Sequence, residues 1–593
     1  MKVPFLGGAY HSRSSDVSSQ ECVNLYYEPP PDGEKHDGSL IGTDGGLVFA
    51  NSTRPSTYPG GADPEMPDYP ANQLPVRGAF VYDDATNVGS AGIPASRRLF
   101  FLIRNILYEY YTAAADGKPY LRDWGTASLL PVASYRSRVT MAGNNVGQIM
   151  LAEGSVGLIL EGTTPSIISD PNFVPTDMVV FQDGYFVATE PGTNRFRYSA
   201  LRDGTSWPAE NFVTTEGRSD TVEALISDRR ELWAFGDRSV EVYYNSGDPD
   251  IPFQRFQGGY IEMGIIARFS AQKFDNTVVW LTQNDRGGVQ VVRAGDGWTP
   301  IIISTPEVSY HMQQYLRVDD AFAYTYQYGG HEFYVLTFPT DNATWAYDAL
   351  TKQWHRRGHV IGNELSRERY NCHAFYNNKH LFGDFENGRV YELSPDAGYL
   401  EEEGWRIELY LADDYALGAP RIWVKDAATG LSYDTSDGQY YDITLDNGSI
   451  HTSWGSYWAP GEAAIDGLPS AASEGNRVVA YLSEPSPIER IRSSQQIAAD
   501  NEARTFVTQF QIDFEEGLSD GTVYLSYSKD GGHTWSSERP KSLGGTGKYT
   551  HRVIWRKLGW GRNWRFRVRT WTTSRVAIKG AWAMIDGEAL ESQ

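Results

Sequence analysis

The sequence has little of what marks several common protein classes. Only two of its 593 residues are cysteine, Cys22 and Cys372, too few for a disulfide scaffold. No apolar run approaches the roughly 18 residues of a membrane span. The N-terminus, MKVPFLGGAYHSRS, lacks the apolar core of a signal peptide. No window keeps a helical period, and the best helical candidate is a short stretch at 493–504. We therefore predict a nearly all-β protein synthesised in a cytoplasm.

Signatures of catalysis are also scarce. The chain has no Gly-Lys-Ser/Thr phosphate-binding loop and no G-x-S-x-G elbow. Glycoside hydrolysis needs two carboxylates that flank the scissile bond, and an acidic chain contains such pairs by chance. Three pairs of this kind are Asp83-Asp84, Asp248/Asp250 and Asp413-Asp414. We predict no catalytic residues.

One histidine group has a spacing that could hold a metal. His355 and His359 are four residues apart, with Cys372 and His373 further along. On a helix this spacing could bind zinc, but here it falls in a turn between strands that Gly358 interrupts. We interpret the histidines as surface or core residues and predict no metal or cofactor.

Positive charge is in deficit, and the formal net charge is −23. Phosphate contacts need positive charge, so general nucleic-acid binding is not expected. The acidity has two interpretations: it keeps the protein soluble, or it provides a surface that DNA passes without sticking.

What the chain does have is many short β patterns, best seen at 221–269. Three apolar runs at 222–226, 231–235 and 239–244 are rich in β-branched and aromatic residues. Gly236-Asp237 predicts a two-residue type II′ hairpin turn. The run at 232–235 is apolar on both faces and should be covered on both sides, whereas the third run alternates and should be half exposed. Such a sheet describes one blade of a β-propeller.

The unit recurs along the chain. Similar apolar cores lie near 98–111, 146–160, 178–187, 278–292, 333–347 and 380–391. Four-stranded blades require a spacing of roughly 40–50 residues. The pattern predicts a propeller of about seven blades.

Changes in composition and strand pattern along the sequence predict four regions. Residues 1–75 contain a proline-rich segment and are expected to form an extended arm that packs along the body or onto a neighbour. The propeller is expected over 76–398, and an inserted β module with its own aromatic residues over 399–484. A C-terminal β-sandwich is expected over 485–593. Its five strand candidates are 506–514, 522–527, 552–555, 564–570 and 576–584.

A short motif in the C-terminal region matches the Asp-box hairpin, S-x-D-x-G-x-T-W. Its residues are Ser528, Asp530, Gly532, Thr534 and Trp535. Asp and Gly shape the turn, and Trp packs beneath it. In sialidases and other β proteins the box is structural and lies away from the active site, so it is weak support for glycosidase activity.

The same region is basic. Nine Lys and Arg residues and no acids lie between Thr550 and Lys579. Alternation over 565–570 should point Phe566 and Val568 inward and the arginines outward. The predicted docking face comprises Arg552, Arg556, Arg565, Arg567 and Arg569. Its partner would be acidic, either another copy of the chain or encapsidated DNA. Alternatively, acids of the same fold neutralise these cations.

Three stretches resemble one protein family. They are 220–267, which includes LWAFG and SVEVYYN; ECVNLY at 21–26 followed by GTDGG at 42–46; and SYSKDGGHTW at 526–535 followed by 552–569. In these stretches the chain is similar to the tail hub, or nozzle, proteins of short-tailed bacteriophages. The region from about 405 to 484 departs from shorter members of that family.

The resemblance implies a structural virion protein of the tail and not an enzyme. Such hubs form a hexameric tube beneath the portal and adaptor rings, continue the DNA channel and help to retain packaged DNA until ejection. Their neighbours are the head-to-tail adaptor, a tail needle, fibre or spike and, at infection, the host cell envelope. The alternative is a glycan-binding or sialidase-like propeller for host-surface recognition.

Overall fold

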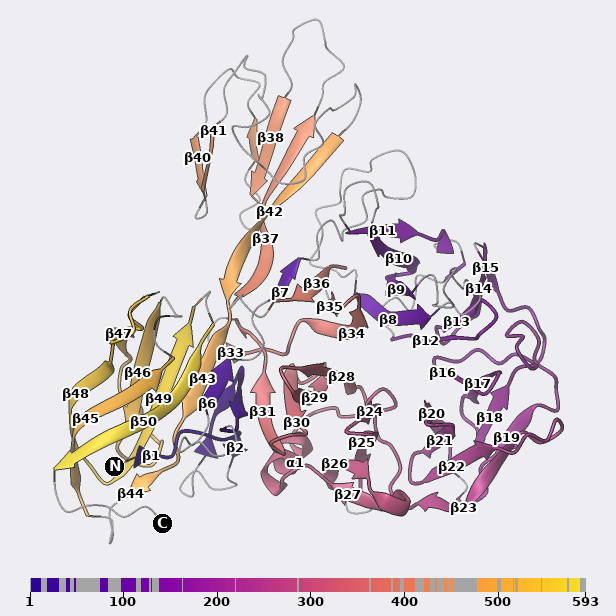
Figure 1. The fold of residues 1–593 in the computed structure, drawn as a ribbon, viewed down its shortest axis with the longest axis horizontal. Helices are drawn as coiled ribbons and strands as arrows, with labels where there is room; N and C mark the ends of the chain where they lie inside the picture. Colours follow the sequence, from indigo (N-terminus) through magenta and orange to yellow (C-terminus); the bar gives the residue numbers. More distant parts are fainter. Residues whose placement is uncertain are drawn as a thin grey trace, which may run out of the picture.

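The structure is a computed structural model with three parts: a ring of small sheets, a β-sandwich beside it and a β module that projects from between them (Figure 1). The residues that it describes are 2–11, 19–30, 39–42, 47–49, 75–83, 97–112, 119–126, 129–130, 138–162, 164–218, 220–284, 287–361, 364–385, 388–394, 399–410, 421–426, 432–434, 442–445, 448–451, 477–498, 503–515, 517, 521–545, 547–572 and 575–586.

The ring is a β-propeller, as expected, and its described strands form seven four-stranded antiparallel blades (Figure 1). Blades 1 to 3 are β8 (Val76–Asp83), β9 (Arg97–Ile103), β10 (Ile106–Thr112) and β11 (Pro119–Asp123); β12 (Thr140–Gly143), β13 (Gln148–Ala152), β14 (Gly157–Glu161) and β15 (Thr164–Ile167); and β16 (Val179–Gln182), β17 (Tyr185–Glu190), β18 (Arg195–Tyr198) and β19 (Phe212–Thr214). Blades 4 and 5 are β20 (Val222–Asp228), β21 (Glu231–Gly236), β22 (Val240–Asn245) and β23 (Phe253–Ile261); and β24 (Gln272–Phe274), β25 (Thr277–Gln283), β26 (Val289–Ala294) and β27 (Pro300–Ile302). Blade 6 is β28 (Phe322–Tyr328), β29 (His331–Phe338), β30 (Ala343–Asp348) and β31 (Gln353–Arg357), and blade 7 is β34 (Tyr370–Tyr376), β35 (Lys379–Asp384), β36 (Val390–Leu393) and β7 (Leu47–Phe49).

Blade 4 shows how the sequence pattern becomes packing. The apolar run at 232–235 lies on β21 and is covered on both faces, as predicted, because blades 3 and 5 pack against it. The ring of Phe235 lies 5.5 Å from that of Trp280 in blade 5. The prediction for β22 was wrong: its first four residues are buried, and the exposed edge strand is β23.

The predicted type II′ turn in blade 4 is also wrong. The backbone N–H of Gly236 donates to Ser239 O, so Asp237 and Arg238 form the loop, and none of these residues has a positive φ. The turn is held instead by the Asp220 carboxylate, which accepts hydrogen bonds from the backbone N–H of Arg238 and from Ser239 Oγ. Gly236 is needed for space, since a Cβ there would lie 2.7 Å from that carboxylate.

The seventh blade is completed by a strand from far back in the chain. β7 pairs antiparallel with β36, with Val48 opposite Glu392. The propeller is therefore closed by joining the beginning of the chain to its last blade.

The sandwich also incorporates the N-terminal region. One sheet is β48 (Val553–Gly561), β45 (Thr505–Phe514), β50 (Ala577–Asp586), β6 (Ser39–Gly42) and β5 (Leu25–Glu28), with β1 (Lys2–Val3) paired to β50. The facing sheet contains β4 (Cys22–Val23), β43 (Glu489–Ser493), β49 (Asn563–Trp571), β46 (Thr522–Ser528) and β47 (Arg539–Ser542), with β44 (Ile497–Ala498) paired to β49. Phe510, Trp555 and Phe566 fill the core between the two sheets. A separate short pair, β2 (Tyr10–His11) and β3 (Ser19–Gln20), lies in the N-terminal segment.

The projecting module is a four-stranded sheet and a hairpin (Figure 1). The sheet comprises β39 (Ser432–Asp434), β38 (Arg421–Asp426), β37 (Tyr399–Tyr410) and β42 (Arg477–Pro487), and the hairpin comprises β40 (Asp442–Leu445) and β41 (Gly448–His451). Its two longest strands, β37 and β42, pair with each other and lead out of and back into the body. A further hairpin of the body joins β32 (Val360–Ile361) to β33 (Glu364–Leu365) between blades 6 and 7.

The helix expected at 493–504 is not found where the structure describes that stretch, because β43 ends at Ser493 and 497–498 form β44. The α-helix among the described residues is α1 (Pro306–Gln313), with a short 3-10 turn, η2 (Asp296–Trp298), before it. Thr305 caps α1 by accepting the backbone N–H of Val308, and Pro306 occupies the first turn.

Candidate functional site

The Asp-box forms a hairpin at the end of β46. Asp530 Oδ1 accepts the hydroxyl of Ser528 at 2.6 Å and the backbone N–H of Thr534 at 2.9 Å. The Thr534 hydroxyl donates to the other carboxylate oxygen, Oδ2, at 2.5 Å. Hydrogen bonds from Ser528 and Thr534 hold the pKa of Asp530 well below its usual value. The turn residues Gly531 and Gly532 have φ of 76° and 108°, which glycine adopts readily. Both oxygens of this carboxylate are therefore used inside the hairpin.

The alternation predicted for β49 is present. Phe566 and Val568 point into the sandwich core. Arg569 contacts Glu489 at 2.5 Å and Glu538 at 2.8 Å, and Arg567 lies 3.1 Å from Glu21.

Two further contacts tie the β49 arginines to the Asp-box. The Arg567 guanidinium stacks on the Trp535 ring at 4.0 Å, and Arg565 donates to Gly531 O at 3.2 Å. These three arginines thus contact groups of their own chain.

The other two residues of the predicted docking face lie in a different place. Arg552 precedes β48 and Arg556 is on it; both are exposed, as is Lys557 beside them. Within the described residues, no carboxylate contacts the side chains of these three cations. The sequence grouped five arginines, and the structure divides them between an internally bonded row and an exposed row.

A junction joins the propeller to the sandwich through β4. This strand pairs in parallel with β31 of blade 6 and antiparallel with β43 of the sandwich. Blade 6 and one sandwich sheet are therefore continuous across the N-terminal segment, in a sheet of ten strands.

Asn24 connects both sides of this junction with one side chain. Its Nδ2 donates to Gly358 O at 2.6 Å and to Glu489 O at 2.7 Å, and its Oδ1 accepts the N–H of Gly358 at 3.0 Å. Asn24 has φ 53°, a left-handed conformation that asparagine tolerates better than most residues.

Arg492 anchors the N-terminal segment to the sandwich. Its guanidinium is fully buried and donates to the carbonyls of Phe5, Gly8 and Glu21 and to Gln20 Oε1, at 2.6 to 3.2 Å. Burial lowers the pKa of Arg492. Four groups of the arm thus converge on one cation.

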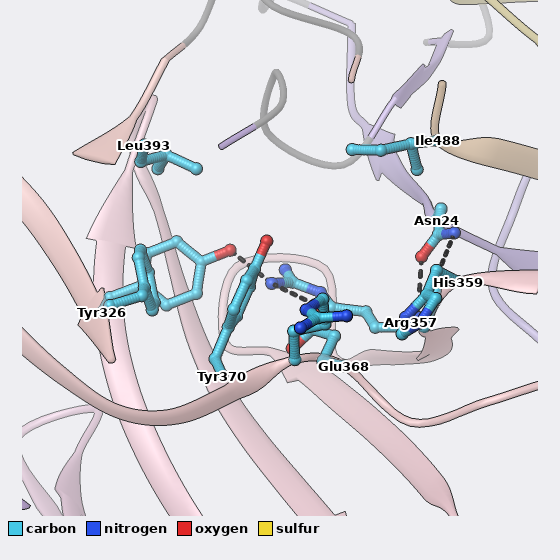
Figure 2. A pocket seen from close by; sticks show the side chains of 11 residues that line it. Asn24, Tyr326, Arg357, His359, Glu368, Tyr370, Leu393 and Ile488 are labelled. Carbon is cyan, nitrogen blue, oxygen red and sulfur yellow. Dashed lines mark hydrogen bonds and ion pairs between the residues drawn. The ribbon is translucent and has the colours of Figure 1, made fainter. Parts of the chain in front are cut away.

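A small cavity of about 50 Å³ lies beside Asn24 (Figure 2). Tyr326, Arg357 and Glu368 line it, and the Arg357 guanidinium donates to the Tyr326 hydroxyl at 2.5 Å. The cavity can hold water but is far smaller than the roughly 300 Å³ that small-molecule sites require.

A larger and more polar cavity, of about 630 Å³, lies at one end of blades 4 and 5. Arg268 lines it and contacts Glu223 of blade 4 at 2.8 Å and Asp177, just before blade 3, at 2.9 Å. Two further acids, Asp237 and Asp319, share the lining. Arg268 therefore links neighbouring blades, and a second cation, Arg238, also lines the cavity.

The histidines of the predicted metal-spacing group do not share one site, and each has different neighbours. His355 is buried and accepts a hydrogen bond from Arg357 at 3.0 Å, whereas His373 contacts His380 at 3.0 Å. Burial lowers the pKa of His373 to about 3 and that of His359 to about 4. Burial also raises the pKa of the Cys372 thiol to about 12. Across the described residues, no group of three or more such side chains could hold a metal ion.

Comparison with protein families identifies the family of the propeller and the sandwich. A model described as the β-propeller of bacteriophage P22 Gp10 matches residues 118–398, and one described as its β-sandwich matches residues 490–586. The chain belongs to the bacteriophage P22 Gp10 family. It is accordingly a structural protein of a phage tail hub and a component of the virion tail.

Some solved structures are also similar to parts of this Gp10-family chain. The exo-β-1,3-galactanase of Phanerochaete chrysosporium is 11% identical, with 69% of this chain and 95% of that chain covered and a TM-score of 0.22. YCF48 from Cyanidioschyzon merolae is 11% identical, with 55% and 98% covered and a TM-score of 0.33. Both TM-scores are too low to support an argument about fold or function. No curated protein matches the chain by sequence.

The Gp10 family places the chain in a head-to-tail complex of a phage. In the part of the chain that the structure describes, no helix has the length and apolarity to cross a membrane. In such a protein, the β4 junction connects two domains of a virion component, and the exposed cations of β48 lie on its surface.

Proposed function

We propose that the chain forms a ring-shaped hub beneath the portal and adaptor, continues the DNA channel, retains the packaged DNA and lets it pass at ejection. The observation that carries this proposal is the match of Gp10 models to both the propeller and the sandwich. The two domains are joined by the N-terminal segment through continuous strand pairing, which suits a rigid building block.

The charge of the chain supports passage of DNA. A wall of net charge −23 repels phosphate, so a channel lined by its acids would not adsorb the genome in transit. We place acidic side chains on the channel side on this ground. A reconstruction in which lysine and arginine line the channel would contradict this placement.

The partners follow from the hub position. We propose a hexamer with the adaptor above it, a needle, fibre or spike alongside or below, and the host envelope at infection. The exposed cations Arg552 and Arg556 are offered as part of a docking face for an acidic partner.

We propose that the chain acts without catalysis. The Asp-box carboxylate binds its own hairpin, which supports a structural role for that motif. Turnover of a sialoside or a β-galactan by the purified protein, lost in a variant of a converging acid pair, would favour the glycan-processing alternative.

The hub role is tested with particles that lack this chain. Heads assembled from a nonsense mutant should package DNA and then lose it, so their DNA becomes sensitive to nuclease. Adding the purified protein should restore nuclease resistance and place new density below the adaptor. Particles that keep their DNA without the chain would contradict the proposal.

A further inference from the structure

We propose that the outer face of the sandwich sheet β48-β45-β50 binds a second copy of this chain, at the acidic outer end of its blades 3 and 4. This inference rests on the proposed hub function, because it names the surface through which one copy contacts the next. It concerns side chains that the fold leaves in solvent.

The face is built by three strands in register. Phe506 lies opposite Trp560, Gln509 lies opposite Arg556 and Met584, and Gln511 lies opposite Ile554 and Trp582. The residues between them in each strand, such as Phe510, Trp555 and Ala583, point into the core and are buried. The alternation of the strands therefore places aromatic, aliphatic, amide and basic side chains together on the solvent side.

These side chains are unusually exposed for their type. Met584 is 59% exposed, Trp560 is 54% exposed and Trp582 is 37% exposed. The Phe506 ring packs against Trp560 at 5.2 Å, which holds the indole in place. Exposed tryptophan, methionine and arginine on one face are the composition of a protein–protein contact.

The positive charge of this face indicates that its partner is an acidic protein. The face and its border carry the exposed cations Arg552, Arg556 and Lys557, whereas the whole chain has a net charge of −23. Another copy of the chain is thus an acidic partner present at equal concentration.

The matching acids lie at the outer end of blades 3 and 4. Glu210 and Asp250 are exposed, and the Tyr198 hydroxyl of blade 3 donates to Asp250 O of blade 4 at 3.5 Å. Burial, Tyr185 and the charges of Glu210 and Asp250 raise the pKa of Tyr198. Next to them, Asp248 is exposed and Ile251 is 57% exposed, which adds an apolar contact at the tip of the β22–β23 loop. Among the described residues, no cation contacts the carboxylates of Glu210 or Asp250.

The two surfaces lie at opposite ends of the molecule. β48 is at the left of the long axis, whereas β19 is at the right and β23 is at the lower right (Figure 1). A contact between different surfaces at opposite ends is heterologous, so repetition gives a ring if the rotation closes.

Cross-linking in assembled virions tests the contact. A variant with Arg556→Cys and Asp250→Cys is treated with a short bis-maleimide, and a second variant carries Lys557→Cys with Ile251→Cys. The native thiols do not interfere, since Cys22 and Cys372 are buried. Both variants should give a ladder of linked multimers, whereas each single cysteine should give no ladder.

The matched control pairs Asp250→Cys with Lys541→Cys, an exposed residue of the opposite sheet, and should leave the chain monomeric. Virions that contain either double-cysteine variant but yield only monomer would overturn the inference. They would leave the hub function intact, because the chain would still be present in the tail.

Mixing charge variants tests the heterologous geometry. Arg556→Glu and Asp250→Lys should each weaken self-association at least about tenfold, and Lys541→Glu should not. A mixture of the two weak variants should recover multimers, since native and charge-swapped contacts can then alternate along the assembly. The double variant Arg556→Glu/Asp250→Lys should recover multimers. A mixture that stays as dissociated as either variant alone would contradict a head-to-tail contact between these residues.

A host glycan bound to this face would give a different result. If Trp560→Ala leaves cross-linking and copy number unchanged but lowers adsorption to host cells, the face binds a host glycan and the inference fails. Trp571→Ala, an exposed tryptophan on the other sheet, is the matched control.

Discussion

At the scale of single residues, a few buried polar side chains decide how the two domains meet. Asn24, Arg492 and His331 each join the N-terminal segment to a part of the chain hundreds of residues away. Buried polar groups are costly unless they are fully bonded, so each contact is strongly specified.

Asn24→Ala should destabilise the protein by about 3 kcal/mol, because three buried backbone groups would lose their partner. Denaturant unfolding measures the change. Asn378→Ala is the matched control, since Asn378 has φ 61° but lies in an exposed turn, and it should cost much less. Equal losses in both variants would assign the effect to the left-handed backbone instead of the hydrogen bonds.

His331 should make the docking of the arm depend on pH. Its Nδ1 lies 2.8 Å from Asp348 and its Nε2 lies 2.7 Å from Glu28 of the arm. Burial opposes the charged form, but the two carboxylates together raise the pKa of His331 above 6.5.

A raised folded pKa gives stability that is complete below the unfolded pKa and is lost as pH rises through the folded value. The melting temperature should therefore fall between pH 6 and pH 8 for the wild type, and this fall should be smaller in His331→Gln. Limited proteolysis of the arm over the same range should follow the melting curve. Identical pH profiles for the two proteins would refute the role of His331.

At the scale of elements, local motifs and distant pairings differ in how they can be predicted. The bonds of the Asp530 carboxylate and the Ser528 hydroxyl are local: they join residues at most four positions apart, so the motif predicts the hairpin. β43, β4 and β7 are short strands whose partners are remote, and no periodic pattern marks them. The start of α1 is marked by Thr305-Pro306-Glu307, but a helix of eight residues is too short to show a sustained helical period.

Asp530→Ala should loosen this hairpin and cost roughly 1–2 kcal/mol, since the backbone N–H and hydroxyl of Thr534 lose their acceptor at an exposed site. Hydrogen exchange should increase at 529–535 while the propeller stays protected. Asp530→Asn keeps one acceptor oxygen, so its exchange rate at 529–535 should lie between those of the wild type and Asp530→Ala. Faster exchange throughout the propeller would show that the box supports more than its own turn.

At the scale of the whole molecule, the N-terminal segment makes one body of the propeller and the sandwich. Removing residues 1–49 would delete the closing strand of blade 7 and the sandwich strands β1, β4, β5 and β6. We expect this truncated protein to lose cooperative unfolding and to be cut rapidly by protease.

The projecting module should be dispensable for folding. Glu403 and Ser483 are already opposite each other in β37 and β42, so 404–482 can be replaced by Asn-Gly as a hairpin turn. This variant should keep the melting temperature of the remaining body within a few degrees. A large loss would show that the module supports the junction.

The all-β class, the blade repeat, the C-terminal sandwich and the Asp-box hairpin can be predicted from the sequence, because each depends on alternation or turn chemistry within a few neighbouring residues. The three-dimensional fold is needed to show which arginines lack an acidic partner. Arg565, Arg567 and Arg569 meet groups brought from elsewhere in the chain, whereas Arg556 does not. It also decided that the N-terminal segment closes the ring and joins the sandwich, since pairing between strands hundreds of residues apart leaves no local pattern to read.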